Sequence, residues 1–174
     1  WVLTKLNTLI REVTENMDAY ELGVASAKVY DFIWDTYCDW YIELTKARLY
    51  DADDDSKRTA QQVLVYVLDQ LLRLLHPFMP FITEEIWQAI PHAGDFLIRA
   101  EWPTPQAALD FAAEADALEM VKNAISAIRA RRAEMNVPPS RKAALYVVSA
   151  HSDYFRQGEG FIRRLAYADQ VVLC

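Results

Sequence analysis

The residues that could carry catalysis or bind a metal are few in this sequence, and their spacing fits none of the common sites. The three histidines are His76, His92 and His151, and none belongs to a His-Glu-x-x-His zinc pair. Cys38 and Cys174 have no Cys or His partner at the spacing of zinc ligands. The sequence also lacks a glycine-rich phosphate loop and a Gly-x-Ser-x-Gly nucleophile motif. We therefore expect no catalytic residue and no metal site in this chain, and two reduced thiols.

An acidic run resembles the start of a calcium-binding loop. Asp51, Asp53 and Asp55 stand at the first, third and fifth positions of an EF-hand pattern. The sixth position is Ser56, where the sharp turn needs Gly, and the twelfth is Gln62, where a bidentate Glu would bind. We therefore predict a solvated loop, and added calcium should leave the melting temperature unchanged.

Hydrophobic periodicity predicts the elements that must position any site. Apolar residues at alternating spacings of three and four predict helices over 3–17, 22–47 and 60–74, the third capped by Ser56, and a short fourth helix that ends near Pro91. Residues 92–113 read as a loop that covers these helices with Phe96, Leu97 and Trp102. A long helix over 118–132, a strand over 143–148, a helix over 153–166 and a strand over 171–174 follow. We expect a mostly α fold: a four-helix bundle over 1–113 and a small helix-strand-helix-strand α/β appendage over 114–174.

Composition and charge limit the classes of partner. Hydrophobic residues make up 53% of the 174 residues and only four are Gly, which favours packed helices. A formal net charge of −7 argues against a nonspecific nucleic-acid binder held by bulk electrostatics, so a nucleic-acid site must be a local patch. Basic residues do cluster, and each cluster can equally be a solvated helix face; the clusters are Lys46 with Arg48, Arg129 with Arg131 and Arg132, Arg141 with Lys142, and Arg163 with Arg164.

The string Leu74–Trp87 joins a helix end, a rigid proline turn and a new helix start. Pro77 disfavours the α conformation at the residue before it, and Pro80 fixes a second φ angle. Thr83 can then cap a new helix, and the Glu residues after it can interact with the helix dipole. We expect Phe78 and Trp87 to be buried against the bundle.

Three segments in the same order resemble the anticodon-binding domain of valyl-tRNA synthetases, which are class I aminoacyl-tRNA synthetases. The proline string is shared with the isoleucine and leucine enzymes, whereas residues 34–46 and 128–142 are closer to the valine pattern. The resemblance spans essentially the whole chain. An isoleucyl or leucyl enzyme is the alternative within this class, and a helical protein-interaction module without an RNA role is the alternative outside it.

The resemblance implies a site for the anticodon loop of tRNA(Val). Such a site needs aromatic faces for unstacked bases and Lys or Arg for phosphates. The resemblance implies Trp1, Val67 and Leu68, and the positions on the first two predicted helices add Lys5, Tyr41, Lys46 and Arg48 as candidates. Arg129, Arg132, Arg141 and Lys142 are candidates for contact with tRNA or with another domain. Each can also be explained as core or solvated surface; Trp1 alone, for example, would more often cover a core.

The resemblance also implies what lies outside this chain. The family's His-x-Gly-His and Lys-Met-Ser-Lys-Ser motifs are missing, so aminoacylation with ATP and Mg²⁺, and editing, would belong to other domains of a longer cytoplasmic ligase. The absence of an initiator Met likewise indicates a fragment. No apolar run reaches the ~18 residues of a membrane span. We expect a monomer that uses no cofactor in this chain.

Overall fold

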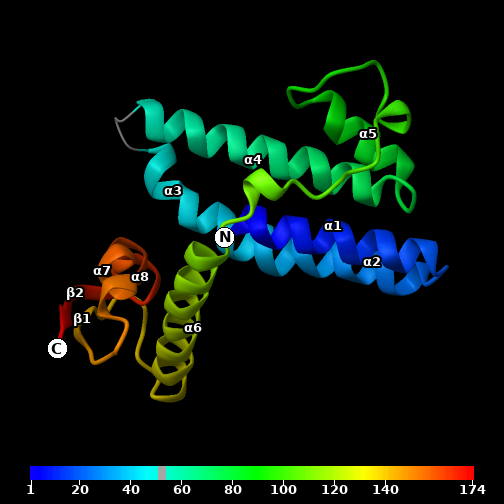
Figure 1. Ribbon diagram of the computed structural model, residues 1–174. Coiled ribbons are helices and arrows are strands. Elements are labelled where there is room, and N and C mark those ends of the chain that lie inside the picture. The colour runs from blue at the N-terminus through cyan, green and yellow to red at the C-terminus, as the bar shows by residue number, and fades with distance from the viewer. Residues whose placement is uncertain (51–53) are drawn as a thin grey trace. The chain divides into compact units, whose positions relative to one another are not determined.

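The computed structural model describes residues 1–50 and 54–174, so two of the three Asp residues of the EF-hand comparison, Asp51 and Asp53, lie outside the described residues. The chain divides into two compact units, Val2–Asp110 and Phe111–Cys174, the second of which also includes Trp1 (Figure 1). Among its described residues the first unit has helices and no strand, and the second holds a two-stranded sheet. A mostly α fold with a small α/β appendage is confirmed.

The helical unit begins with an antiparallel pair. Helix α1 (Val2–Asp18) buries Leu6, Ile10 and Val13, as its apolar spacing predicts. The turn that follows places Tyr20 in the left-handed region, with φ of 58°. One continuous helical segment then runs from Leu22 to Leu49, through α2 (Leu22–Asp31), the π-helix η1 (Phe32–Ile42) and α3 (Glu43–Leu49).

The π-helix changes which residues of this long segment are buried. A π turn is wider than an α turn, so residues five apart share a face. Phe32 and Tyr37 are accordingly buried, followed by Leu44 and Thr45. Ala47, predicted to lie on the apolar stripe, is exposed. The predicted helix is therefore correct in extent, and its apolar stripe is buried at Tyr37 and Leu44 but not at Ala47.

Tyr37 joins this segment to α4 (Asp54–Leu75), because its hydroxyl donates to the carbonyl of Leu64 at 3.0 Å. Burial, with a smaller effect of Cys38 and Tyr41, raises the pKa of Tyr37 from 10.0 to about 12. The folded state therefore keeps the phenol protonated where the unfolded chain ionises it. The stability contributed by this difference is complete below pH 10 and is lost as the pH rises through about 12.

We expect the free energy of unfolding of Tyr37→Phe to fall less than that of the parent between pH 10 and 12. Below pH 10 the variant should be less stable than the parent, because it lacks a hydrogen bond worth about 1 kcal/mol. Urea denaturation at a series of pH values measures this. Parallel pH dependences for the two proteins would contradict the role of Tyr37.

The two predicted helix caps are wrong. Ser56 lies inside α4, and its hydroxyl accepts from Nε of Arg48 at 2.9 Å. Helix α5 (Pro80–Gln88) begins at Pro80, where the missing N–H costs nothing because the first N–H groups of a helix have no partner in it. Thr83 is fully buried in the first turn of α5, and its hydroxyl donates to the carbonyl of Met79 at 2.8 Å.

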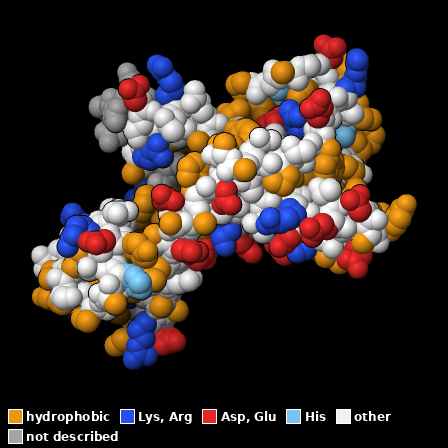
Figure 2. Space-filling model, viewed as in Figure 1, with side chains coloured by type: hydrophobic (Ala, Val, Ile, Leu, Met, Phe, Trp, Pro, Cys, Tyr) orange, Lys and Arg blue, Asp and Glu red, His pale blue; other side chains and the backbone are white. Residues whose placement is uncertain are grey.

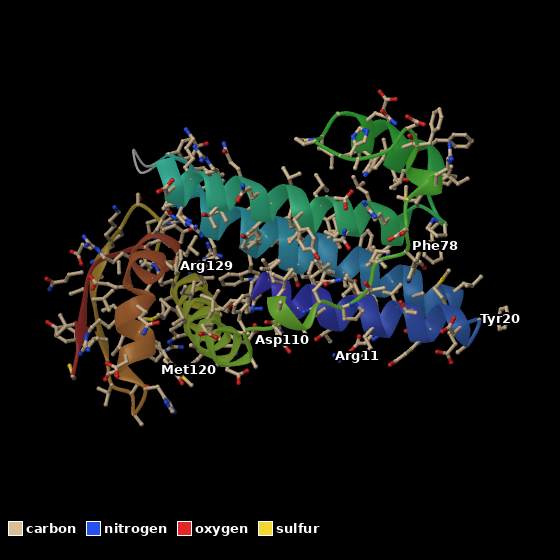
Figure 3. The ribbon with its side chains drawn as sticks, turned by 45° about the horizontal axis from the view of Figure 1, so that its top comes forward. Arg11, Tyr20, Phe78, Asp110, Met120 and Arg129 are labelled. Carbon is tan, nitrogen blue, oxygen red and sulfur yellow. The ribbon has the colours of Figure 1, made fainter. Side chains whose placement is uncertain are left out.

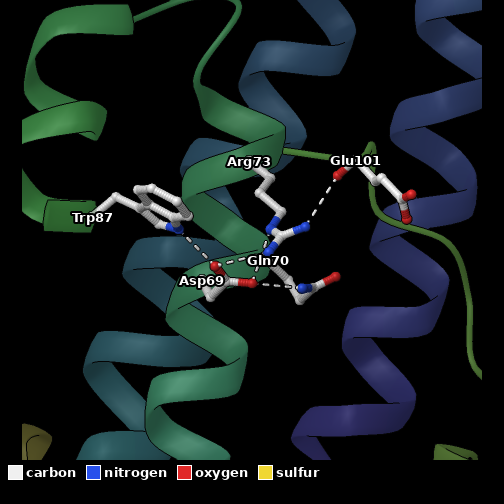
Figure 4. A network of polar contacts seen from close by, with 5 residues as sticks. All are labelled: Asp69, Gln70, Arg73, Trp87 and Glu101. Atoms are coloured by element: carbon white, nitrogen blue, oxygen red, sulfur yellow. Dashed lines mark hydrogen bonds and ion pairs between the residues drawn. The ribbon is translucent and has the colours of Figure 1, made fainter. Parts of the chain in front are cut away.

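Trp87 anchors α5 to α4. Its side chain is 0% exposed, and its Nε1 donates to Oδ1 of Asp69 at 2.7 Å (Figure 4). Asp69 also forms a 2.9 Å ion pair with Arg73, whose Nη1 donates to the carbonyl of Glu101 at 3.2 Å. The predicted burial of Trp87 is confirmed, whereas Phe78, at the turn before α5, is only partly buried (Figure 3).

The segment after α5 covers the bundle in part as predicted. Leu97, in the 3-10 turn η2 (Leu97–Arg99), is buried with Leu72 and Trp87. Trp102 donates from Nε1 to the hydroxyl of Thr14 at 2.8 Å. Phe96, however, is more than half exposed, so its predicted packing is wrong. A second 3-10 turn, η3 (Ala107–Leu109), ends the unit.

The α/β unit packs α6 (Ala112–Glu134), α7 (Ser152–Gln157) and α8 (Glu159–Leu165) with a parallel pair of strands. Strand β1 (Ala143–Val147) pairs with β2 (Ala168–Leu173), and Leu145 lies opposite Val171. Buried apolar residues from the helices form its core: Val121, Ile125, Phe155, Ile162 and Leu165.

Gly158 divides the predicted helix 153–166 into α7 and α8. A Cβ at this position would lie 2.9 Å from both Cγ atoms of buried Val121. We expect Gly158→Ala to lower the free energy of unfolding by about 1–3 kcal/mol, the usual cost of overpacking. Gly160→Ala is the control, because nothing lies within 4 Å of its added Cβ. Thermal denaturation compares the two, and equal melting temperatures would contradict the close packing.

Candidate nucleic-acid interface

Tyr41 and Arg48 lie together where the long helical segment meets α4. Arg48 donates from Nε and Nη2 to the hydroxyl and carbonyl oxygens of Ser56, at 2.9 and 3.1 Å. Burial raises the pKa of Tyr41, and the nearby charge of Arg48 partly offsets that rise. Lys46 forms an ion pair with Glu43. All three predicted residues keep partial exposure, but Arg48 also has a structural role.

Lys5 lines a shallow groove of about 270 Å³ within the helical unit. The groove lies between α1 and the segment formed by α2 and η1; its other lining residues are Thr8, Leu9, Glu12, Lys28, Asp31, Phe32, Asp35 and Thr36. Lys28 crosses between the helices in a 2.6 Å ion pair with Glu12. Two lysines face three carboxylates here, so the groove suits hydrogen-bonding base edges better than phosphates.

An exposed aromatic pair on the same helical segment was missed by the sequence interpretation. Tyr30 and Trp34 are 60% and 52% exposed, and their ring centroids lie 6.2 Å apart at an angle of 56°. Large aromatic side chains that remain in solvent offer faces on which unstacked bases can lie. A signal was available in the sequence. Tyr30 and Trp34 each come one position after a residue of the apolar stripe predicted for the helix 22–47, Val29 and Ile33, and they are four residues apart.

Trp1 is part of the α/β unit and is already engaged there. Its indole Nε1 donates to Oε2 of Glu119 at 2.7 Å, and Nζ of Lys122 lies 5.3 Å from the ring centroid. A base that stacks on this ring must share it with a cation–π contact. Trp1 is therefore a weaker candidate platform than the exposed pair formed by Tyr30 and Trp34.

Val67 is a core residue and Leu68 is partly buried, and their assignment to the anticodon site stays a prediction. Val67 has no exposed surface in the described structure. Leu68 packs against the buried cluster of Leu72, Trp87 and Leu97. Both side chains therefore contribute to the packing of the helical unit.

Arg129 and Arg132 also hold their own unit together. Arg129, on α6 (Figure 3), donates from Nε to the carbonyl of Leu165 at 2.7 Å. Arg132 donates to the carbonyls of Pro138, at 3.0 Å, and Arg141. Both guanidinium groups lie 5.8 Å from the ring centroid of Tyr167. These contacts give both arginines a structural role within the unit, and their predicted contact with tRNA or another domain stays a prediction.

The remaining surface shows charges of both signs. Figure 2 shows Lys and Arg side chains scattered among Asp and Glu on the visible face, without one extended basic surface. Arg141 and Lys142 are exposed. Tyr20 projects from the turn between α1 and α2 (Figure 3).

Among the described residues, no three His, Cys, Asp or Glu side chains are placed to hold a metal ion, and no helix is long and apolar enough to cross a membrane.

Comparison with known families decides the class of this domain. The model of the anticodon-binding domain of tRNA ligases matches residues 1–147. The chain belongs to this family. The match includes the whole helical unit, α6 and β1, and therefore both the groove and the exposed aromatic pair.

Individual relatives of this anticodon-binding domain are valine–tRNA ligases. The ligase of Geobacillus kaustophilus is 49% identical over 147 residues, which cover 84% of this chain and 17% of the relative. Those of Halalkalibacterium halodurans and Enterococcus faecalis are 43% and 40% identical over 176 residues, which cover 99% of this chain and 20% of each relative. The chain thus spans about a fifth of the length of the curated relatives it matches.

Proposed function

We propose that this domain recognises the anticodon loop of tRNA(Val). The observation that carries the proposal is the family match over 1–147, combined with valine–tRNA ligases that align with up to 99% of the chain. The isoleucine and leucine alternatives share the proline turn, but the relatives compared here are valine ligases. Membership of the family implies binding to a tRNA, and the proposal adds that this tRNA is tRNA(Val).

The helical unit supplies the surface for this recognition. Tyr30 and Trp34 offer ring faces for anticodon bases, and the groove beside Lys5 offers donors and acceptors for base edges. Lys46 lies near the end of the same helical segment, and its ammonium group can replace the ion pair with Glu43 by one with a phosphate. Selectivity then comes from hydrogen bonds that a wrong base would leave unmade.

The wider activity is part of the same proposal. The domain would belong to an ATP-dependent valine–tRNA ligase of the cytoplasm, whose catalytic and editing domains are its partners in the same polypeptide. ATP and Mg²⁺ would bind in that catalytic domain. We propose that the chain itself acts as a monomer and contributes recognition without a catalytic residue.

Stem-loop binding tests the proposed choice of tRNA. Labelled stem-loops with the valine, isoleucine and leucine anticodons are titrated with the chain at equal ionic strength, and fluorescence anisotropy gives each Kd. We expect the valine stem-loop to bind most tightly. Preference for another stem-loop would assign the domain to that enzyme, and binding to none of them would favour a protein-interaction module.

Removing an exposed ring should weaken this binding. We expect Trp34→Ala to lose about 1–3 kcal/mol of affinity for the valine stem-loop, the usual worth of one base on one aromatic face. Phe81→Ala is the control, because Phe81 is 90% exposed on α5 of the same unit. Equal Kd values for Trp34→Ala and the parent would remove the aromatic pair from the site.

A further inference from the structure

The two units of the chain differ in charge. Residues 111–174 contain nine Lys and Arg against seven Asp and Glu, a formal charge of +2. Residues 2–110 contain nine against eighteen, a formal charge of −9. Phosphate contacts supply most of the sequence-independent affinity for nucleic acids. The helical unit is therefore poorly suited to supply that affinity alone, and the α/β unit is the better source.

One cavity in the α/β unit gathers cations at the beginning of both strands. It has a volume of about 540 Å³ and is lined by Lys142, Gly160, Arg163, Arg164, Ala168 and Asp169. Because β1 and β2 are parallel and Ala143 lies opposite Ala168, Lys142 stands beside the start of β2. Arg163 and Arg164 come from the end of α8, only a few residues before that strand. Three cations thus converge with one carboxylate.

A weak ion pair lies beside the cavity, between Arg163 and Glu159. The contact between Arg163 and Glu159 is long, at 4.0 Å, and both side chains are about half exposed. Exposed pairs of this kind contribute little and exchange readily. Arg163 and Arg164 also complement the dipole of α8 at its C-terminal end. That role does not explain Lys142, which precedes β1 and completes the cluster.

We propose that Lys142, Arg163 and Arg164, here called the basic cluster, bind backbone phosphates of the tRNA. The proposal rests on the proposed function, since the RNA is the one that the helical unit recognises. Lys and Arg donors around an open cavity of this size can meet phosphate oxygens without reading bases. The basic cluster then provides affinity that is independent of sequence, while the helical unit provides selectivity.

The test compares two triple variants with the same net charge. The cluster variant carries Lys142→Gln, Arg163→Gln and Arg164→Gln. The matched control carries Arg99→Gln, Arg131→Gln and Arg156→Gln, three exposed arginines that pair with nearby carboxylates outside the cavity. Kd for full-length tRNA(Val) transcript is measured by filter binding between 50 and 300 mM KCl, and circular dichroism monitors the fold of each variant.

The expected result is specific to the cluster variant. The slope of log Kd against log salt should fall by about 2, since each lost phosphate contact removes roughly 0.7–0.9. The control should change that slope by less than half as much. A charge-conserving variant, with Lys142→Arg, Arg163→Lys and Arg164→Lys, should retain the parent slope. Equal slopes for the cluster variant and the control would overturn the basic cluster as a phosphate site.

The same titrations separate this proposal from the proposed function. The ratio of Kd values for tRNA(Val) and a transcript with altered anticodon bases measures selectivity. The cluster variant should keep the parent ratio while both affinities fall. If the parent chain binds both transcripts with equal Kd, the proposed function is refuted. The salt slopes of the cluster variant and the control then still test the basic cluster. Loss of selectivity with an unchanged salt slope would refute the cluster proposal.

Discussion

Replacing Trp87 with Ala is expected to lower the free energy of unfolding by about 3–5 kcal/mol, the range measured for aromatic truncation in protein cores. The side chain extends from α5 and is fully buried, and its Nε1 donates to Asp69 of α4. Its ring stacks on that of His92, with the two ring centroids 3.8 Å apart. Truncation therefore leaves a cavity and removes one partner of a carboxylate that also binds Arg73. Urea denaturation measures the change.

Two variants separate the causes of this loss. Trp87→Phe keeps most of the ring but removes the hydrogen bond to Asp69, so we expect a loss of about 1–3 kcal/mol. Phe81→Ala, on the exposed side of α5, should change stability by less than about 0.5 kcal/mol. A loss below 1 kcal/mol for Trp87→Ala would show that α5 does not depend on this anchor.

Arg129→Ala is expected to lower the stability of the α/β unit by about 2–3 kcal/mol. A hydrogen bond from a charged donor contributes about 1.5–3 kcal/mol, and a cation–π contact adds about 0.5–1. Arg129 makes both, to the carbonyl of Leu165 and to the ring of Tyr167. Hydrogen exchange of amides in α6 and α8 measures the effect within this unit.

The neighbouring arginine provides the control for Arg129. Arg131 is exposed and pairs only across one turn, with Glu134 at 2.9 Å. We expect Arg131→Ala to cost less than about 0.5 kcal/mol. A large loss of tRNA affinity by Arg129→Ala with unchanged amide protection would restore the original interpretation of Arg129 as an RNA contact.

The hydrophobic spacing predicted a helix and its buried face correctly where the helix keeps regular α geometry. The spacing of Leu6, Ile10 and Val13 predicted both α1 and its core face. It could not predict η1, because hydrogen bonds from residue i to i+5 leave no consistent mark in a stripe that is read at 3.6 residues per turn.

The caps failed because a side chain can find a better partner than the backbone N–H. Ser56 accepts from Arg48, and Thr83 is bonded to His76, with 2.7 Å between its hydroxyl and Nδ1. Both helices also begin before the predicted cap, at Asp54 and Pro80, so each hydroxyl lies inside a helix and does not meet a free N–H at its start. Capping residues are therefore predicted correctly only where no such partner competes.

The candidate site was predicted in kind but only partly in its residues. Lys5 lines a groove, whereas Val67 is fully buried and Leu68 is partly buried. The predicted apolar stripe of this helix included Val67, and the assignment of both residues to the site rested on the family resemblance alone. Tyr30 and Trp34 could have been found from their positions beside the predicted stripe, but only the packed structure shows how much of each ring stays exposed.

Exchange of the anticodon bases in one stem-loop tests the central claim most directly. The stem and loop length stay constant, and the three valine anticodon bases are replaced by three that differ at each position. Competition at fixed ionic strength gives the ratio of the two Kd values for the parent chain. Recognition of the anticodon predicts at least a tenfold weaker Kd after the exchange, since each lost base contact is worth about 1–3 kcal/mol. Equal Kd values for the two stem-loops would contradict anticodon recognition by this chain.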